Sequence, residues 1–155
     1  MTTLDHIKQW LTEQGISFRT LHHQATRTSE ESAAVRGEAL AVGTKAIVMK
    51  AGGRFVLFVI SAAQRIDGRK IRAQLGVKKT RFATPDELME LTGLAPGSVP
   101  PFGRPILDLD LYVDTSVQAN DRVAFNAGSL TDSIIMDAAD YFTLIDATLF
   151  DFARD

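Results

Sequence analysis

The residues Thr44-Lys45-Ala46-Ile47-Val48-Met49 form a strand pattern in which both faces are mainly apolar. This pattern predicts a central strand that is buried on both sides. A second apolar run extends from Arg54 to Ile60, and Gly52-Gly53 between the two runs suits a tight hairpin turn. We therefore expect a hairpin at the centre of the fold, with the other elements around it.

Helix signals lie on both sides of this hairpin in the sequence. Helices are expected from Thr3 to Gly15, from Thr28 to about Glu38, and from Asp67 to about Leu75. The clearest helix start is Thr84-Pro85-Asp86-Glu87, because a capping threonine, a proline at the first helical position and a glutamate at the third occur together. Gly93 is expected to end that helix.

Further strands are predicted from alternating or continuous apolar residues. They are expected around Ile16 and Phe18, from Leu107 to Val113, from Arg122 to Phe125 and from Ser133 to Met136, before a last helix from about Ala138. This order lacks the strict βαβ alternation of a doubly wound fold. It predicts a mixed α/β architecture with a strand-rich centre and helices around it.

Length and composition fit one domain over residues 1–155. A chain of 155 residues with 45% hydrophobic content can bury roughly two thirds of its unfolded surface. No apolar run reaches the roughly twenty residues of a membrane span, and no signal-peptide pattern is present, so a cytoplasmic location without a membrane partner is expected. The chain has no cysteine, which excludes disulfides, thiol nucleophiles and thiolate-rich zinc sites.

Charge is distributed unevenly around a net value of −2. Seven of the seventeen basic residues lie in one segment: Arg65, Arg69, Lys70, Arg72, Lys78, Lys79 and Arg81. Ten aspartates fall between Ile106 and Asp155, where only two arginines occur. Such a dipolar chain can steer a polyanion onto one face, and the alternative is that these charges only solvate a surface helix and strand.

The loop Gly97-Ser98-Val99-Pro100-Pro101-Phe102-Gly103 has an unusual mixture of permissive and rigid backbone. Gly97 can adopt a positive φ, whereas Pro100 and Pro101 fix φ and extend the residues before them. The N–H groups of Ser98, Val99, Phe102 and Gly103 could then stabilise an oxyanion. The alternative is a proline-rich connector between a helix and a strand.

Two further positions are candidates for a binding site. Lys45 lies on an apolar strand, so its ammonium either reaches water at the strand end or belongs to a pocket that binds an anion. The segment Asn126-Ala127-Gly128-Ser129 follows a predicted strand, and its small residues would allow a ligand to approach the backbone, or would form an ordinary turn.

Other catalytic classes receive no support. No Gly-x-Ser-x-Gly motif is present, so a Ser-His-Asp hydrolase is not expected. His22 and His23 are adjacent rather than one helical turn apart, and the nearby carboxylates form no ligand pattern, so neither a metal nor another cofactor is expected. His23 is expected to be structural or exposed rather than to line a pocket entrance.

The order of the motifs resembles that of the YbaK/EbsC family, the editing domains related to the insertion domain of bacterial prolyl-tRNA synthetase. The motifs are Gly43 to Val48, a basic helix, Leu75 to Lys79, Ala83 to Leu88 with Thr92-Gly93, the GxxxP loop from Gly97 to Pro101, Val113-Asp114, and Phe125 to Gly128. The similarity extends from about His23 to Ile145. It implies one central, mixed, strongly curved β-sheet with surrounding helices.

The resemblance also implies a function, namely hydrolysis of the ester between a wrong amino acid and the terminal adenosine of tRNA. The substrate expected from the family is prolyl-tRNA mischarged with a small amino acid. By the same resemblance, the family's lysine corresponds to Lys45, and the loop residues Gly97, Ser98, Val99, Pro100 and Pro101 hold the carbonyl or aminoacyl end. The family has no obvious general base, so a terminal ribose hydroxyl is expected to help to activate water.

Some residues depart from the family pattern. Ala46 stands where several editing members have a polar residue, and no histidine follows Phe125. The residues then expected to form the amino-acid pocket are Ala46, Phe102, Asn126, Gly128 and Ser129, and Asp132 is a further candidate.

Two other functions stay open: a non-catalytic module that binds a nucleotide, an RNA end or a synthetase, and a hydrolase of other small acyl esters. The expected partners are the tRNA acceptor end and an aminoacyl-tRNA synthetase, and the protein is expected to be a monomer or a homodimer.

Overall fold

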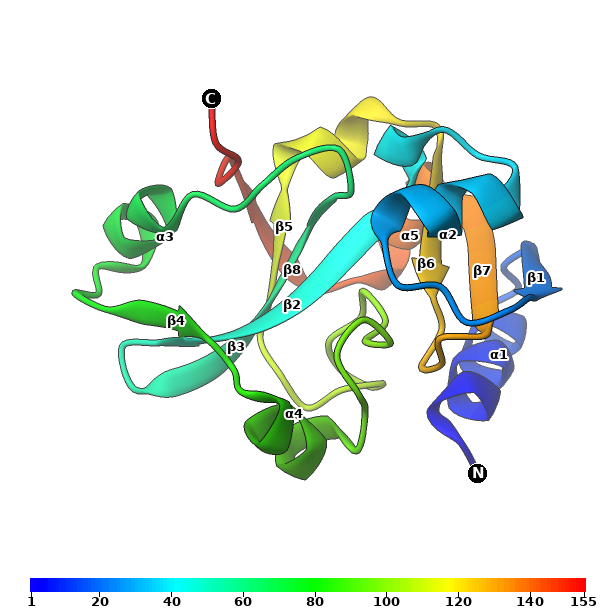
Figure 1. The fold of residues 1–155 in the computed structure, drawn as a ribbon, viewed down its shortest axis with the longest axis horizontal. Coiled ribbons are helices and arrows are strands. Elements are labelled where there is room, and N and C mark those ends of the chain that lie inside the picture. Colours follow the sequence, from blue (N-terminus) through cyan, green and yellow to red (C-terminus); the bar gives the residue numbers. More distant parts are fainter.

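The hairpin expected from the sequence forms the long central ribbon of the computed structural model, which describes residues 1–155 (Figure 1). Strand β2 (Thr44–Ala51) pairs antiparallel with β3 (Arg54–Ser61). The more deeply buried strand is β3, whereas the first four residues of β2 are only half-buried. The prediction that β2 is buried on both sides is therefore wrong for its first half. In addition, β4 (Thr80–Phe82) pairs only with Met49–Ala51, so one edge of that first half has no partner strand.

The strands form two sheets rather than the single sheet expected. The larger sheet has the order β4-β2-β3-β5-β8, with β5 (Leu111–Asp114) and β8 (Ala147–Phe150) parallel to β3. The smaller sheet has the order β1-β7-β6, which are Phe18–His22, Asp132–Asp137 and Arg122–Asn126. An isolated bridge between Gly43 and Ala124 links the two sheets. The mixed α/β class is confirmed, whereas strong curvature stays a prediction.

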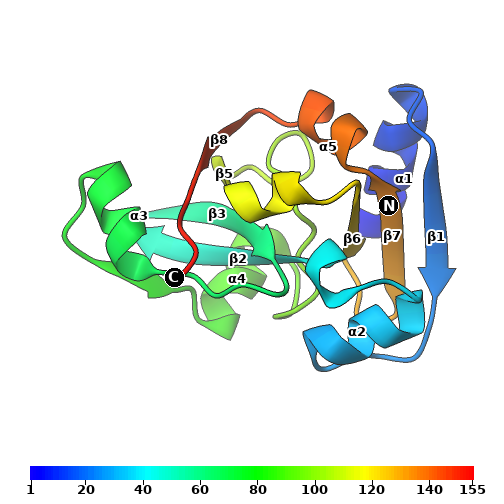
Figure 2. The same cartoon turned by 90° about the horizontal axis from the view of Figure 1, so that it is seen from above.

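Five α-helices surround these sheets: α1 (Thr3–Glu13), α2 (Ser29–Arg36), α3 (Gly68–Leu75), α4 (Pro85–Thr92) and α5 (Ala138–Leu144). The small sheet lies with α1, α2 and α5 at one end of the molecule, and α3 lies at the other (Figures 1 and 2). Thr84 and Glu87 form the expected capping box of α4, and Asp67 caps α3. Two short 3₁₀ helices, η1 (Leu40–Val42) and η2 (Thr115–Ala119), complete the chain. None of the helices has the length and apolar character needed to span a bilayer.

The strand expected from Leu107 to Val113 begins only at Leu111. Before it, the N–H of Leu107 donates to the carbonyl of Gly103 and the N–H of Leu109 to the carbonyl of Leu107, so the backbone turns instead of extending. Leu107 and Leu109 nevertheless enter the core, and Asp108 is exposed. An alternating pattern thus arises here from a coiled loop that buries every second residue.

Hydrophobic residues form two clusters on the two faces of the larger sheet's central strands. The cluster of 21 buried residues includes Phe102, whose ring packs edge-on against Trp10 and Phe125 at centroid distances of 5.3 and 5.2 Å. The cluster of six includes Phe58 and Phe152, with ring centroids 5.4 Å apart. Alternate residues of β3 contribute to the two clusters, as expected for a strand that is covered on both faces.

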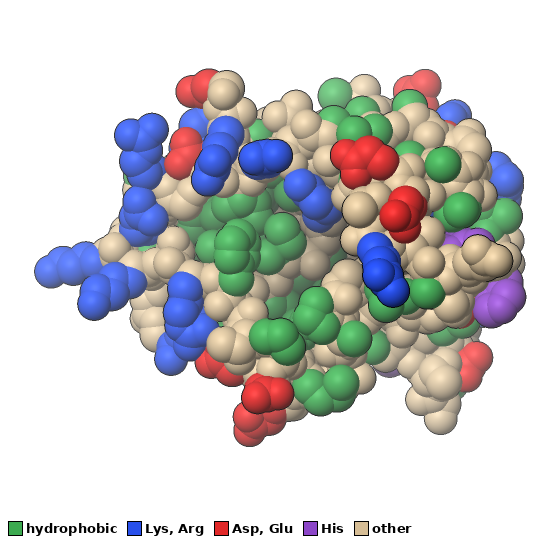
Figure 3. Space-filling view, viewed as in Figure 1, with side chains coloured by type: hydrophobic (Ala, Val, Ile, Leu, Met, Phe, Trp, Pro, Cys, Tyr) green, Lys and Arg blue, Asp and Glu red, His purple; other side chains and the backbone are tan.

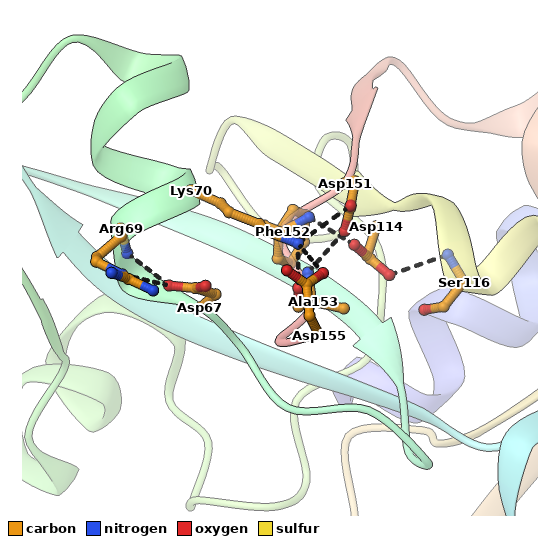
Figure 4. Close-up of polar contacts among 9 residues, drawn as sticks. All are labelled: Asp67, Arg69, Lys70, Asp114, Ser116, Asp151, Phe152, Ala153 and Asp155. Carbon is orange, nitrogen blue, oxygen red and sulfur yellow. Dashed lines mark hydrogen bonds and ion pairs between the residues drawn. The ribbon is translucent and has the colours of Figure 1, made fainter.

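The C-terminal segment after β8 closes the smaller cluster and anchors α3 (Figure 4). Phe152 is fully buried; its N–H donates to Asp114 Oδ1 at 2.7 Å, and its carbonyl accepts from the Asp67 N–H at 2.7 Å. The ammonium of Lys70 on α3 donates to Asp151, Ala153 and Asp155. Strands β4 and β8 and this segment were not expected from the sequence.

Candidate active site

A cavity of about 460 Å³ opens beside the unpaired edge of β2. Its wall combines residues that are distant in sequence but were singled out there: Lys45, Ala46, Gly97, Val99 and Asn126. The remaining lining residues are Thr26, Arg27, Thr28, Ser29, Ser32, Arg36, Thr44, Ile47, Ala62, Pro96 and Leu130. The wall therefore contains three cations, many hydroxyl groups, and no carboxylate or imidazole.

Lys45 is held at this wall by the segment that follows β3. Its Nζ donates a short hydrogen bond to the main-chain carbonyl of Gln64. Partial burial lowers the pKa of the Lys45 ammonium, and the nearby charge of Arg65 lowers it further, whereas the charge of Glu30 opposes this shift. No carboxylate forms an ion pair with Lys45. The cation is thus partly desolvated and able to interact with an anionic or carbonyl group in the cavity.

The loop after α4 is fixed by hydrogen bonds at several points. Gly97 has a φ of +86°, and its carbonyl accepts from Asn126 Nδ2 at 2.7 Å. The carbonyl of Ser98 accepts from the Gly128 N–H at 2.9 Å, and that of Pro101 accepts from the hydroxyl of the buried Tyr141 at 2.7 Å. These bonds anchor the loop at Gly97, Ser98 and Pro101, while its rigidity stays a prediction.

Some loop residues do not take the positions expected of them. The N–H of Ser98 donates to the Ala95 carbonyl at 3.1 Å, so it is not available to an oxyanion. The residues Ser98, Pro100 and Pro101 are buried and do not line the cavity, where the loop is represented by Gly97 and Val99. The loop thus presents a shorter stretch of main chain than the sequence suggested.

Three residues expected in the amino-acid pocket lie elsewhere. Phe102 is fully buried in the larger cluster. Gly128 faces α1, where a Cβ atom would lie 2.9 Å from the Thr3 side chain, so close packing requires glycine there. The hydroxyl of Ser129 bonds with that of Thr131, and Leu130 between them lines the cavity instead. Of the five residues expected in the amino-acid pocket, Ala46 and Asn126 line the cavity.

His22, His23 and Asp132 take part in side-chain pairs outside the cavity wall. His22 Nδ1 lies 2.9 Å from Asp132 Oδ1, and this hydrogen bond is the main cause that lowers the pKa of Asp132. His23 Nε2 lies 2.8 Å from Ser133 Oγ. Neither histidine nor Asp132 lines the cavity, so we assign them no contact with a ligand there.

Sequence reasoning missed the contribution of α2. Thr26 and Ser32 are buried beside the cavity with their hydroxyl oxygens 2.7 Å apart, and Arg36 is buried at the end of the helix. A basic residue in the last turn of a helix is ordinary, because it interacts favourably with the helix dipole. The sequence therefore carries no signal that distinguishes Arg36 from a surface residue.

A basic surface covers the end of the molecule formed by α3 and β4, where lysines and arginines surround an apolar patch (Figure 3). A hollow of about 770 Å³ is lined by Arg69, Arg72 and Arg81, and an adjacent hollow of about 710 Å³ by Lys78 and Lys79. Phe82 lines the first hollow and is 60% exposed. The surface thus combines cations with an exposed aromatic ring.

Four of the seven basic residues are engaged or placed differently. Arg69 Nε lies 3.9 Å from Asp67 Oδ1. Lys70 pairs with Asp151 and Asp155 from the acidic C-terminal part of the chain, and Arg81 makes a bidentate contact with Glu87. Arg65 lies close enough to Lys45 to influence its pKa. Basic and acidic residues that lie in different parts of the sequence therefore partly neutralise one another in the folded protein.

Comparison with known proteins identifies the family. The profile of the aminoacyl-tRNA editing domain matches residues 23–144. The chain belongs to the aminoacyl-tRNA editing domain family. Membership confirms the resemblance found in the sequence and the expected class of activity, which is hydrolysis of aminoacyl-tRNA.

Individual members of the editing domain family support this assignment. The Multifunctional Ser/Thr-tRNA deacylase ProXp-y of Escherichia coli (strain K12) is 35% identical over 150 residues, which are 93% of this chain and 89% of that protein. The Proline--tRNA ligase of Bacillus licheniformis is 32% identical over 107 residues, which are 69% of this chain but only 18% of the ligase. A crystal structure of a protein thought to be a trans-editing enzyme for prolyl tRNA synthetase has a TM-score of 0.87 at 26% identity, with coverage of 100% and 99% of the two chains.

Proposed function

We propose that the protein is a trans-editing deacylase that hydrolyses the ester of tRNA charged with a small wrong amino acid, and that the cavity beside β2 is its active site. The observation that supports this proposal is the convergence of Lys45, Gly97, Val99 and Asn126 on that one cavity. Its volume of about 460 Å³ suits an aminoacyl group with part of the terminal nucleoside.

The residues of the cavity can orient the ester and stabilise the negative charge that develops during its hydrolysis. Lys45 offers a partly desolvated positive charge, and the loop offers main chain of fixed geometry, so both can bind the ester and the negative charge that develops on its carbonyl oxygen. Because the wall has no carboxylate or imidazole, we propose that a ribose hydroxyl of the substrate assists the attacking water. Water adds to the carbonyl carbon, the bond to the ribose oxygen breaks, and that oxygen receives a proton.

For the amino acid, we propose serine and threonine alongside the small residues expected from the family. The cavity wall carries hydroxyls from Thr26, Thr28, Ser29, Ser32 and Thr44, which can exchange hydrogen bonds with a hydroxylated side chain. The name of the Escherichia coli relative points to the same amino acids. For the tRNA, similarity to prolyl-tRNA synthetases favours tRNA(Pro).

We propose that the basic surface binds the single-stranded acceptor end of the tRNA. Arg72, Lys78 and Lys79 are positioned for phosphates, and Phe82 can stack on a base. Along β2, the five steps from Lys45 to Lys50 correspond to about 17 Å at about 3.3 Å per residue. A few unpaired nucleotides can span this distance, so one strand can reach from the basic surface to the cavity.

The experiment that tests this function is a deacylation panel with the purified protein. Seryl-, threonyl-, alanyl- and prolyl-esters on tRNA(Pro), together with Ser-tRNA(Ser) and Thr-tRNA(Thr), are incubated with wild type and with Lys45→Ala. We expect release of small amino acids by wild type and at least a hundredfold loss in Lys45→Ala, since it removes the only lysine of the cavity. Binding of tRNA without hydrolysis of any ester would instead support a non-catalytic module.

A further inference from the structure

Arg36 is a charged residue of the cavity wall that has no part in the mechanism above. It is the last residue of α2 and only 8% of its surface is exposed. No carboxylate pairs with it: Nε donates to Ser133 Oγ at 2.9 Å, and Nη2 donates to Asn126 Oδ1 at 3.0 Å. Burial lowers the pKa of Arg36 to about 10. A guanidinium that loses its hydration without gaining an ion pair needs another reason to be retained.

The contact with Asn126 determines which way that amide points. Arginine has five donors and no acceptor, so the Asn126 atom that faces Nη2 must be the carbonyl oxygen Oδ1. Ser133 Oγ lies 3.4 Å from the same oxygen, and its hydroxyl can act toward that oxygen only as a hydrogen-bond donor. The Nδ2 group is therefore directed to the opposite side, where it donates to the Gly97 carbonyl at 2.7 Å.

The peptide between Gly97 and Ser98 is thereby held at both ends. Its carbonyl accepts from Asn126, and its N–H, which belongs to Ser98, donates to the Ala95 carbonyl at 3.1 Å. Because a peptide unit is planar, these two bonds fix its rotation. This peptide leads directly to Val99, which lines the cavity wall.

We propose that Arg36 is a positioning residue of the editing reaction, which acts through Asn126 to set the orientation of the Gly97–Ser98 peptide and hence of the loop that faces the substrate. The role in the reaction rests on the deacylase function proposed above. Arg36 lies 90 positions before Asn126, so α2 and the small sheet control the geometry of a loop that belongs to neither of them.

The test compares substitutions that separate geometry from charge. Arg36→Lys keeps the positive charge but has one donor centre, which cannot serve Ser133 and Asn126 with the same geometry. Asn126→Asp still accepts from Arg36 but turns an acceptor toward the Gly97 carbonyl. We expect each variant to lower kcat on the order of ten- to a hundredfold with KM changed less than about threefold, since misplacement of the loop affects the reacting geometry. The double variant is expected to be no worse than the poorer single variant, because the two residues act as one unit.

A matched control and a second readout exclude a merely structural role. Arg122→Lys changes an exposed arginine that pairs with Glu38 outside the cavity, and its kcat should equal that of wild type. Amide hydrogen exchange at Ser98 should accelerate at least tenfold in Arg36→Lys and in Asn126→Asp but not in the control, because the bond to Ala95 loosens when the carbonyl side is released.

Three results would overturn the proposal: wild-type kcat in Arg36→Lys, an increase in KM alone, or full additivity in the double variant. An increase in KM alone would mean that the guanidinium binds an anionic part of the substrate. If Arg36→Lys does not fold, Asn126→Asp tests the same link from a residue that is partly exposed. If wild type hydrolyses no aminoacyl-tRNA, the proposed function fails, and unchanged exchange at Ser98 would separately reject the positioning of the loop by Arg36.

Discussion

Single residues set the conformation of the main chain at the candidate site, and Gly97 shows how. Its φ is +86°, a value that costs other residues roughly 1–2 kcal/mol, although a Cβ atom would have room at 3.4 Å from Leu130. We expect Gly97→Ala to lose about that free energy of unfolding and to lower kcat, because the loop relieves its strain beside the substrate. Chemical denaturation and single-turnover deacylation measure the two effects.

The matched control for this change is Gly93→Ala. Gly93 has a similar φ of +72°, no neighbour within 4 Å of a Cβ atom, and a position at the end of α4 outside the cavity. It should lose a similar free energy of unfolding while kcat per folded molecule stays at the wild-type value. Equal losses of kcat in both variants would show that Gly97 has no special role at the site.

At the scale of elements, α4 is joined to β4 by an ion pair that makes stability depend on pH. The bidentate hydrogen bonds from Arg81, followed by that from the Thr84 N–H, lower the pKa of Glu87 from 4.5 to about 2. A carboxyl with a depressed folded pKa stabilises the fold above the unfolded pKa, and this contribution disappears as pH falls from about 4.5 toward 2. We therefore expect the difference in Tm between wild type and Glu87→Gln to be largest near pH 7, to shrink as pH falls below about 4.5, and to vanish only below about pH 2. A constant difference across this range would contradict the assignment.

The elements α3 and β4 carry the proposed RNA surface, and charge and stacking can be separated there. Arg72→Gln should weaken tRNA binding and reduce the magnitude of the salt slope by about 0.7–0.9, the value for one lost phosphate contact. Phe82→Ala should weaken binding by about 1–3 kcal/mol and leave the slope unchanged, because a stacked base releases no counterion. Titrations at several salt concentrations distinguish the two.

Arg19→Gln is the control for this surface. Arg19 is exposed on β1, at the end of the molecule opposite to α3 (Figure 1). Its substitution removes the same charge from the chain but should change neither the affinity nor the salt slope. A slope that changes equally in Arg19→Gln and Arg72→Gln would mean that the net charge of the molecule, rather than this surface, attracts the tRNA.

At the scale of the whole molecule, the C-terminal segment joins the larger sheet to α3. Phe152 is fully buried against Phe58, and its main chain bonds Asp67 at the start of α3 and Asp114 at the end of β5. We expect Phe152→Ala to cost about 3–5 kcal/mol, which corresponds to a fall in Tm of roughly 6–20 °C. Hydrogen exchange in α3 should also increase, because the helix loses its anchor.

The comparison for Phe152 is Leu149→Ala on β8, since Leu149 is 38% exposed. Its substitution should cost much less free energy of unfolding and should not change exchange in α3. If Phe152→Ala lowered Tm without affecting α3, the segment would contribute only to the core.

Local signals explain how much of the architecture could be predicted. Capping residues and left-handed glycines act within one or two turns, so Thr84, Asp67 and Gly76 placed their helices correctly from the sequence alone. The hairpin was equally local, because Gly52 and Gly53 both adopt the positive φ that its turn requires. Strands β4 and β8 were missed because each is short and is defined mainly by its partner strand.

The features of the candidate site likewise fall into those that the sequence predicts and those that depend on the tertiary structure. The sequence by itself determined the family, the position of Lys45 on its strand and the positive φ of Gly97, because residue order and local backbone preference are sufficient for these. Only the tertiary structure decided that Asn126 faces the cavity while Phe102 lies in the core, and that Arg36 supports the loop. The physical reason is that side-chain direction and hydrogen-bond partners depend on packing between distant segments, such as those of Arg36 and Ser133, which are 97 residues apart, and no local pattern records this packing.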